Sequence, residues 1–124
     1  LNKARCIKND QHVFQWTKDL TEKDKCSQCG SQMRPHIVWF GEMPFQMDEI
    51  HSIAEKSDLF VSIGTSGEVY PAAGFVNMFK DMQKPTLELN LEPSRNQNLF
   101  DFGIYKPATI AVEEFKDLII KKLK

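Results

Sequence analysis

A length of 124 residues is typical of one compact domain, and a hydrophobic content of 41% is enough to build a core. The 16 basic and 17 acidic residues leave a formal net charge of -1, which gives no electrostatic indication of binding to nucleic acid or to an anionic membrane. Because no apolar run approaches membrane-spanning length and no signal peptide opens the chain, we expect a cytoplasmic protein. The first residue is Leu1 and not methionine, so we expect either a processed chain or a piece of a longer one.

Residues 1–36 differ in composition from the rest of the chain. They contain all three cysteines, Cys6, Cys26 and Cys29, and many lysine, aspartate, glutamine and serine residues, with few apolar side chains to bury. So small a segment needs a cross-link or a metal ion to hold it together. We therefore predict a small separate module over residues 1–36, followed by a main domain over residues 37–124.

The main domain alternates short apolar runs with amphipathic stretches. The apolar runs predict strands over residues 37–40, 59–63, 86–91 and 108–112. Apolar residues at helical spacing predict helices over residues 47–54, 72–82 and 115–123. Strands and helices that alternate at this spacing favour parallel strand pairing with right-handed crossovers. We therefore predict the α/β class, with part of an open parallel sheet.

Two polar stretches follow the second and third predicted strands, "GTSG" at residues 64–67 and "NLEP" at residues 90–93. Ligands of open parallel sheets bind at the carboxyl ends of the strands. Glycine lets a ligand approach the backbone, the hydroxyls of Thr65 and Ser66 can bind ribose or phosphate, and the Glu92 carboxylate can hold a ribose diol. These stretches predict a nucleotide site, although ordinary turns would have the same composition and neither glycine-rich nucleotide fingerprint occurs.

The runs "RPHIVWFGE", "GTSGEVYPAAGF" and "LNLEPS", in this order behind a cysteine-bearing segment, closely resemble the sirtuins, the NAD-dependent protein-lysine deacylases. The resemblance extends from about Arg5 to the C-terminal end, and Trp39 resembles the bacterial and class III branch, which removes succinyl-type as well as acetyl groups. It implies a Rossmann-like domain that carries a small zinc-binding module. It also implies that NAD and an acyl-lysine protein or peptide meet in the cleft between them.

The resemblance assigns roles to individual residues. The family's contacts near the nicotinamide ribose and the phosphates match Gly64, Thr65 and Ser66. Its contacts with the adenosine ribose match Asn90, Leu91 and Glu92, and a contact near the adenine matches Ala108. The two segments between which a substrate peptide adds as a strand match Phe40-Gly41-Glu42 and Gly67-Glu68-Val69, which is recognition by main-chain hydrogen bonds.

The family's glycine-rich NAD loop, its Asn-Ile-Asp-type loop and its catalytic histidine do not occur in this sequence. In the sirtuins these motifs lie upstream of the zinc module. We therefore expect the C-terminal half of a sirtuin, with no catalytic residue, inactive without its N-terminal half. The three histidines, His12, His36 and His51, are expected to be structural or surface residues. The alternative is a catalytically inactive module that binds nucleotide, peptide or a partner.

A structural zinc site normally has two Cys-x-x-Cys pairs, and only the second pair is complete here. Cys6 matches the start of the first pair, but Asn9, a poor zinc ligand, stands three residues further on. Three alternatives stay open. They are a structural zinc held by Cys6, Cys26 and Cys29 with a fourth ligand such as His12, Asp10 or water, a metal-free remnant, and a Cys26–Cys29 disulfide.

Overall fold

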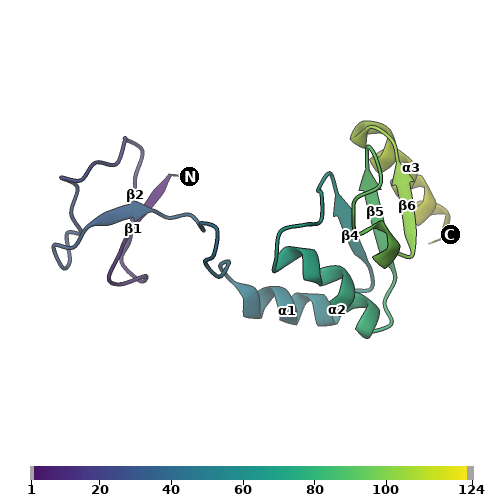
Figure 1. Cartoon of the computed structure of the whole chain (residues 1–124), viewed down its shortest axis with the longest axis horizontal. Helices are drawn as coiled ribbons and strands as arrows, with labels where there is room; N and C mark the ends of the chain where they lie inside the picture. Colours follow the sequence, from purple (N-terminus) through teal and green to yellow (C-terminus); the bar gives the residue numbers. More distant parts are fainter. Residues whose placement is uncertain (1, 123–124) are drawn as a thin grey trace. The chain divides into compact units, whose positions relative to one another are not determined.

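The computed structural model describes residues 2–122 and divides the chain into two compact units, one ending at Phe45 and the other beginning at Gln46 (Figure 1). Each unit has its own three-stranded sheet. Among residues 2–122, no helix combines the length and the apolar character that crossing a bilayer requires.

The first unit is built on a short antiparallel sheet in the order β2-β1-β3. Its strands are β1 at Lys3–Cys6, β2 at Val13–Gln15 and β3 at Met33–Pro35. The sequence pattern did not predict these strands, because strands of three or four residues are too short to show a clear alternation. The buried core consists of Ala4, Cys6, Cys26 and Met33, with Phe14, Trp16 and Leu20 packed against it.

The strand predicted over residues 37–40 is wrong for the residues that the structure describes. This segment forms a turn after β3, in which the Glu42 N–H donates to the Trp39 carbonyl at 3.0 Å. A strand needs a neighbouring strand for its backbone hydrogen bonds, and within residues 2–122 no strand pairs with this segment. The apolar side chains of residues 37–40 therefore do not mark a strand of this unit's sheet.

The second unit contains a parallel sheet in the order β4-β5-β6. Its strands are β4 at Phe60–Ile63, β5 at Thr86–Asn90 and β6 at Phe102–Tyr105, and both neighbouring pairs are parallel. Its helices are α1 at Met47–Lys56, α2 at Phe75–Asp81 and α3 at Ala108–Lys122, with short 3₁₀ turns at Ala72–Gly74 and Gln97–Leu99. The predicted α/β class with a parallel sheet is confirmed.

The two faces of the sheet are covered by different helices. Leu87 and Leu89 of β5 pack with Ala111 of α3. Because successive residues of a strand point to opposite faces, Phe60 of β4 faces the other way from Val61, and its ring lies 5.2 Å from that of Phe79 on α2. Figure 1 shows α2 and α3 on opposite sides of the sheet.

The strand predicted over residues 108–112 is wrong, because this segment begins α3. Pro107 precedes the helix, and its carbonyl accepts the N–H groups of Ile110 and Ala111 at 2.8 and 3.0 Å. A proline at the entrance and the complete burial of Ala111 against β5 favour the helix over the strand preference of the β-branched residues. The predicted C-terminal helix is confirmed as far as the described residues reach, and Leu123 lies outside them.

Candidate functional site

The loop after β4 turns sharply at two glycines. The Gly64 N–H still donates to the Leu89 carbonyl at 2.9 Å, as a continuation of the sheet. Gly64 and Gly67 then adopt φ values of +64° and +69°, which favour glycine over residues with a side chain. Thr65 and Ser66 lie between them and are exposed to solvent. The turn therefore presents backbone and two hydroxyls at the carboxyl end of the sheet.

Two asparagine side chains hold this loop against the loop after β5. The Asn90 amide nitrogen donates to the Thr65 carbonyl at 2.7 Å, and the Asn96 amide nitrogen donates to the Gly67 carbonyl. The Asn96 N–H in turn donates to the Ser94 hydroxyl at 3.2 Å. Sequence reasoning did not single out Asn96, because an asparagine in a loop has no distinctive spacing. These bonds join the two loops into one surface.

A buried carboxylate supports the second loop from below. Glu88 of β5 is 1% exposed, and its Oε2 accepts the Tyr105 hydroxyl at 3.1 Å and the Ser94 N–H at 3.4 Å. Burial, followed by the hydrogen bond to Glu88, raises the pKa of Tyr105. The polar network fixes the backbone that follows β5. It was missed in the sequence because Glu88 sits inside an apolar run.

The two loops line one shallow crevice. It is formed by Gly64, Thr65, Ser66, Glu68, Asn90, Leu91, Glu92, Pro93, Ser94 and Arg95. The structure thus brings together six of the seven residues predicted for the cofactor. The seventh, Ala108, does not line this crevice; it begins α3 just after the Lys106 N–H donates to the Asn90 carbonyl at 2.9 Å.

A second, mostly apolar cavity of about 180 Å³ lies beside the same loop. It is lined by β4, α2 and the loop residues Thr65, Gly67, Val69 and Asn96. Two residues predicted for peptide binding, Gly67 and Val69, therefore line a hollow. The third, Glu68, points elsewhere and pairs with Arg95 at 2.8 Å.

The other predicted peptide segment, residues 40–42, belongs to the first unit. Phe40 is 95% exposed, and Gly41 has a φ of +85°. Glu42 instead turns back into its own unit, where its Oε2 accepts Arg34 Nη2 at 3.0 Å and lies 3.4 Å from Arg5 Nη2. The hydrogen bond from Arg34 lowers the pKa of Glu42 to about 2.

A stacked side chain completes this arrangement. The Arg34 guanidinium lies 3.7 Å from the centre of the Trp39 ring, and the Trp39 N–H donates to Glu42 Oε2 at 3.0 Å. Glu42 therefore positions the segment, in which the Phe40 side chain is 95% exposed and that of Trp39 51%.

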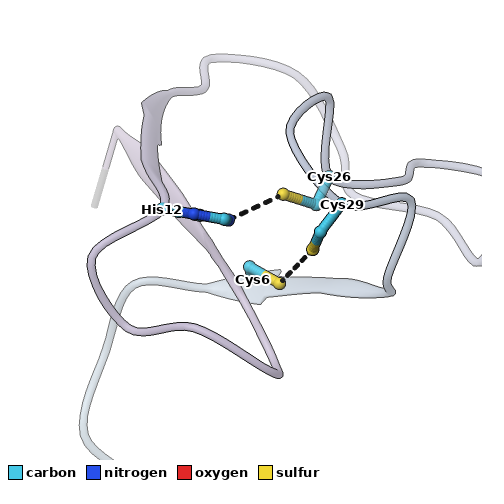
Figure 2. Close-up of side chains that lie close together, drawn as sticks. All are labelled: Cys6, His12, Cys26 and Cys29. Carbon is cyan, nitrogen blue, oxygen red and sulfur yellow. Dashed lines mark hydrogen bonds between the residues drawn. The ribbon is translucent and has the colours of Figure 1, made fainter.

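The three cysteines and one histidine gather in the first unit (Figure 2). Cys6 ends β1, His12 directly precedes β2, and Cys26 and Cys29 lie in the loop between β2 and β3. Their donor atoms all lie within 4.8 Å of one another. Cys6 Sγ is 3.4 Å from Cys29 Sγ, and Cys26 Sγ is 3.4 Å from His12 Nδ1.

The cysteines are free thiols, so the Cys26–Cys29 disulfide is not formed in this structure. A hydrogen bond from the Ser31 side chain lowers the pKa of Cys29 to about 6, while burial raises the pKa of Cys26. Three sulfurs and an imidazole nitrogen are donors that suit tetrahedral zinc. Asp10, another predicted candidate, lies outside the group and pairs with Arg5 at 3.4 Å.

A parallel α/β unit with a crevice at its strand ends and a separate thiol-imidazole unit define a Rossmann-like type of protein with a zinc-type module. The sequence profile of the Sir2 family matches residues 1–71, and the chain belongs to this family. The resemblance stated from the sequence motifs is thereby confirmed.

Two curated relatives are each 50% identical to this chain. The alignment with the NAD-dependent protein deacylase of Escherichia coli (strain K12) is 126 residues long and covers 100% of this chain and 45% of that protein. The NAD-dependent protein deacylase SIR2rp3 of Leishmania major aligns over 125 residues, 98% of this chain and 51% of that protein. The chain thus spans about half the length of these relatives.

Solved structures show the same fold. A Sir2 homologue in complex with NAD has a TM-score of 0.81 and 28% identity, over 100% of this chain and 50% of that one. A Sir2 structure with a p53 peptide and NAD+ has a TM-score of 0.72 at 22% identity, over 96% of this chain and 52% of that one.

Proposed function

We propose that this chain forms part of an NAD-dependent protein-lysine deacylase, in which the crevice at the strand ends binds NAD. The observation that carries this proposal is the meeting of residues 64–66 and 90–92 in one crevice. It is supported by the curated relatives named as NAD-dependent protein deacylases at 50% identity and by the Sir2 homologue solved with NAD at 28% identity.

In this proposal several of the residues predicted for the cofactor have defined tasks. Bound NAD supplies an activated ribose carbon that receives the acyl group as nicotinamide leaves. The exposed hydroxyls of Thr65 and Ser66 donate to phosphate or ribose oxygens, and the Glu92 carboxylate accepts from ribose hydroxyls. Leu91, 66% exposed, offers apolar surface to the adenosine. Ala108 at the start of α3 stands near the adenine.

Residues 40–42 and residues 67–69 are each proposed to bind the acyl-lysine substrate through main-chain hydrogen bonds. The exposure of Phe40 and the hollow beside Gly67 and Val69 support this assignment. Trp39 links the chain to the branch that accepts succinyl as well as acetyl groups, so we include desuccinylation. We also propose a cytoplasmic location, because free cysteines are typical of a reducing compartment.

We assign no catalytic base among the three histidines. His12 belongs to the thiol cluster, His36 stacks on Phe45 at 4.6 Å, and His51 meets the edge of Phe75 at 6.3 Å. Each of the three histidines contacts side chains of its own unit, and none of them lines the crevice.

We further propose a structural zinc ion held by Cys6, Cys26 and Cys29. The donor set fits this ion, since two of the thiols are buried and all three lie in one group. The ion would tie β1 to the loop before β3 in a unit whose apolar core is small.

The test is an assay of nicotinamide release by the intact protein, with acetyl-lysine and succinyl-lysine peptides. We expect Ser66→Ala and Glu92→Ala to raise the KM for NAD about tenfold or more, because a hydrogen bond to a charged group contributes roughly 1.5–3 kcal/mol. The matched controls are Ser52→Ala on α1 and Glu113→Gln on α3, both exposed and outside the crevice, which should leave the KM unchanged. Binding of NAD with no release of nicotinamide from NAD in the presence of either peptide would refute deacylation and favour a binding module.

A further inference from the structure

We propose that His12 is the fourth zinc ligand, coordinating through Nδ1 and taking the place of the second cysteine of the first Cys-x-x-Cys pair. This inference rests on the zinc site proposed above, and it concerns the donor set of that site. The site would then hold three sulfurs and one nitrogen in place of four sulfurs.

Two distances of the cluster are close to the edges of a zinc tetrahedron, and all four donor atoms lie within 4.8 Å of one another. Zn–S bonds of about 2.3 Å and a Zn–N bond of about 2.0–2.1 Å imply edges of about 3.8 Å between two sulfurs and about 3.6 Å between sulfur and nitrogen. The structure has 3.4 Å between Cys6 Sγ and Cys29 Sγ, and 3.4 Å between Cys26 Sγ and His12 Nδ1. Figure 2 shows the imidazole pointing toward the three sulfur atoms. Small adjustments would therefore complete the tetrahedron.

The other candidates for the fourth position are engaged elsewhere. Asp10 is 82% exposed at its side chain and lies 3.4 Å from Arg5. Asn9, which occupies the cysteine position of the motif, directs its amide at the outer edge of the imidazole, with Nδ2 at 3.1 Å from His12 Nε2. Water is not required as a ligand, because the imidazole already supplies a fourth donor within the group.

Asn9 is therefore placed as a positioning residue for the histidine. Coordination through Nδ1 leaves the proton on Nε2, so the Asn9 amide must turn to offer its oxygen to this N–H. That oxygen now accepts the Gln11 N–H at 3.0 Å. Gln11 is exposed, so water can replace this bond when the amide turns. An outer hydrogen bond of this kind fixes the orientation of a ligating imidazole.

The altered donor set changes the charge of the site. Each thiol gives up its proton on coordination and the imidazole binds neutral, so three thiolates, one imidazole and Zn²⁺ carry a net charge of about −1 instead of the −2 of four thiolates. The Lys8 N–H lies 3.4 Å from Cys6 Sγ and can donate to this thiolate.

The test replaces zinc by Co²⁺ in the intact protein and reads the visible spectrum, which distinguishes a three-sulfur, one-nitrogen site from a four-sulfur site. We expect His12→Ala to weaken Co²⁺ and Zn²⁺ binding at least tenfold, and Asn9→Ala to weaken it by about tenfold or less. Combining His12→Ala with Asn9→Cys completes the first Cys-x-x-Cys pair. This double variant should recover tight binding with the spectrum of four thiolates. His51→Ala, in the other unit, is the control and should bind metal as the wild type does.

X-ray absorption at the zinc edge of the wild type gives an answer that does not depend on whether a variant folds. We expect three sulfur neighbours and one nitrogen neighbour. A wild-type spectrum of three sulfurs and oxygen, or unchanged metal affinity in His12→Ala, would refute the role of His12 while the zinc site stands. A wild-type protein that binds no zinc would refute the site itself, and nicotinamide release would still test the proposed deacylation separately.

Discussion

Leu89 and Leu91 are two residues apart in the chain, and the structure gives them opposite roles. Leu89 is 1% exposed and packs between β5 and α3, whereas Leu91 is 66% exposed at the rim of the crevice. We expect Leu89→Ala to lower the free energy of unfolding of the second unit by about 2–5 kcal/mol. The upper half of this range applies because the neighbouring Ala111 is already small and cannot fill the cavity. Leu91→Ala should change it by about 0.5 kcal/mol or less.

Binding should show the reverse order. If the adenosine of NAD covers Leu91, removal of its side chain should cost about 1 kcal/mol of affinity, or about a fivefold higher KM. Leu89→Ala should leave the KM nearly unchanged in the fraction that is folded. Urea titration followed by far-UV circular dichroism measures the first effect, and steady-state kinetics of the intact protein measure the second. A stability loss for Leu91→Ala as large as that for Leu89→Ala would show that the sheet is packed differently, and an unchanged KM would remove Leu91 from the NAD site.

Three further outcomes follow from the contacts described. Exchanging both Ser66 and Glu92 for alanine should raise the KM for NAD more than either change alone, without a shift in thermal stability. A double variant with the stability and the KM of the wild type would show that these strand ends are ordinary turns. Cys26→Ser, or a chelator, should destabilise the first unit, measured by tryptophan fluorescence, more than the second unit, measured by helical circular dichroism, and full stability in chelator would favour a metal-free remnant. The pKa of Glu42 is lowered to about 2 by Arg34, so its contribution to stability is complete above the ordinary glutamate pKa and is lost as the pH falls toward 2. Glu42→Gln should flatten that acid slope, and an unchanged slope would show that the ion pair does not couple to folding.

The sequence predicted the central part of the parallel sheet well, because the physical signal there is strong. Four consecutive residues of β5 are buried, and the two leucines among them, Leu87 and Leu89, mark the strand. The spacing of Val76 and Phe79 marked α2 for the same reason, since both are buried on one face.

Other elements could not be predicted, because their stability comes from contacts that are distant in the chain. β6 is a half-exposed edge strand with a glycine, so its composition resembles that of a loop. β1, β2 and β3 are stabilised by pairing with one another and by the small core around Cys6, and neither leaves a periodic pattern. Tertiary packing outweighs local preference in such cases.

The candidate site, too, could be predicted from the sequence only in part. Its residue types at the strand ends were visible as motifs, whereas Asn96 and Glu88 hold the loops through contacts that join distant parts of the chain. His12 was one of several possible ligands in the sequence, and only the fold sets it beside Cys26.

The division into two units has a practical consequence for thermodynamic measurements. Both tryptophans, Trp16 and Trp39, lie in the unit that ends at Phe45, whereas the described α-helices all lie in the unit that begins at Gln46. Intrinsic fluorescence and helical dichroism therefore report on different halves of the chain. One denaturant titration read by both signals tests whether the halves unfold together, because coincident midpoints indicate a single cooperative transition and separate midpoints indicate two. NAD and zinc, added separately, would each raise the unfolding midpoint of one signal if the halves unfold independently, and of both signals if the halves unfold together.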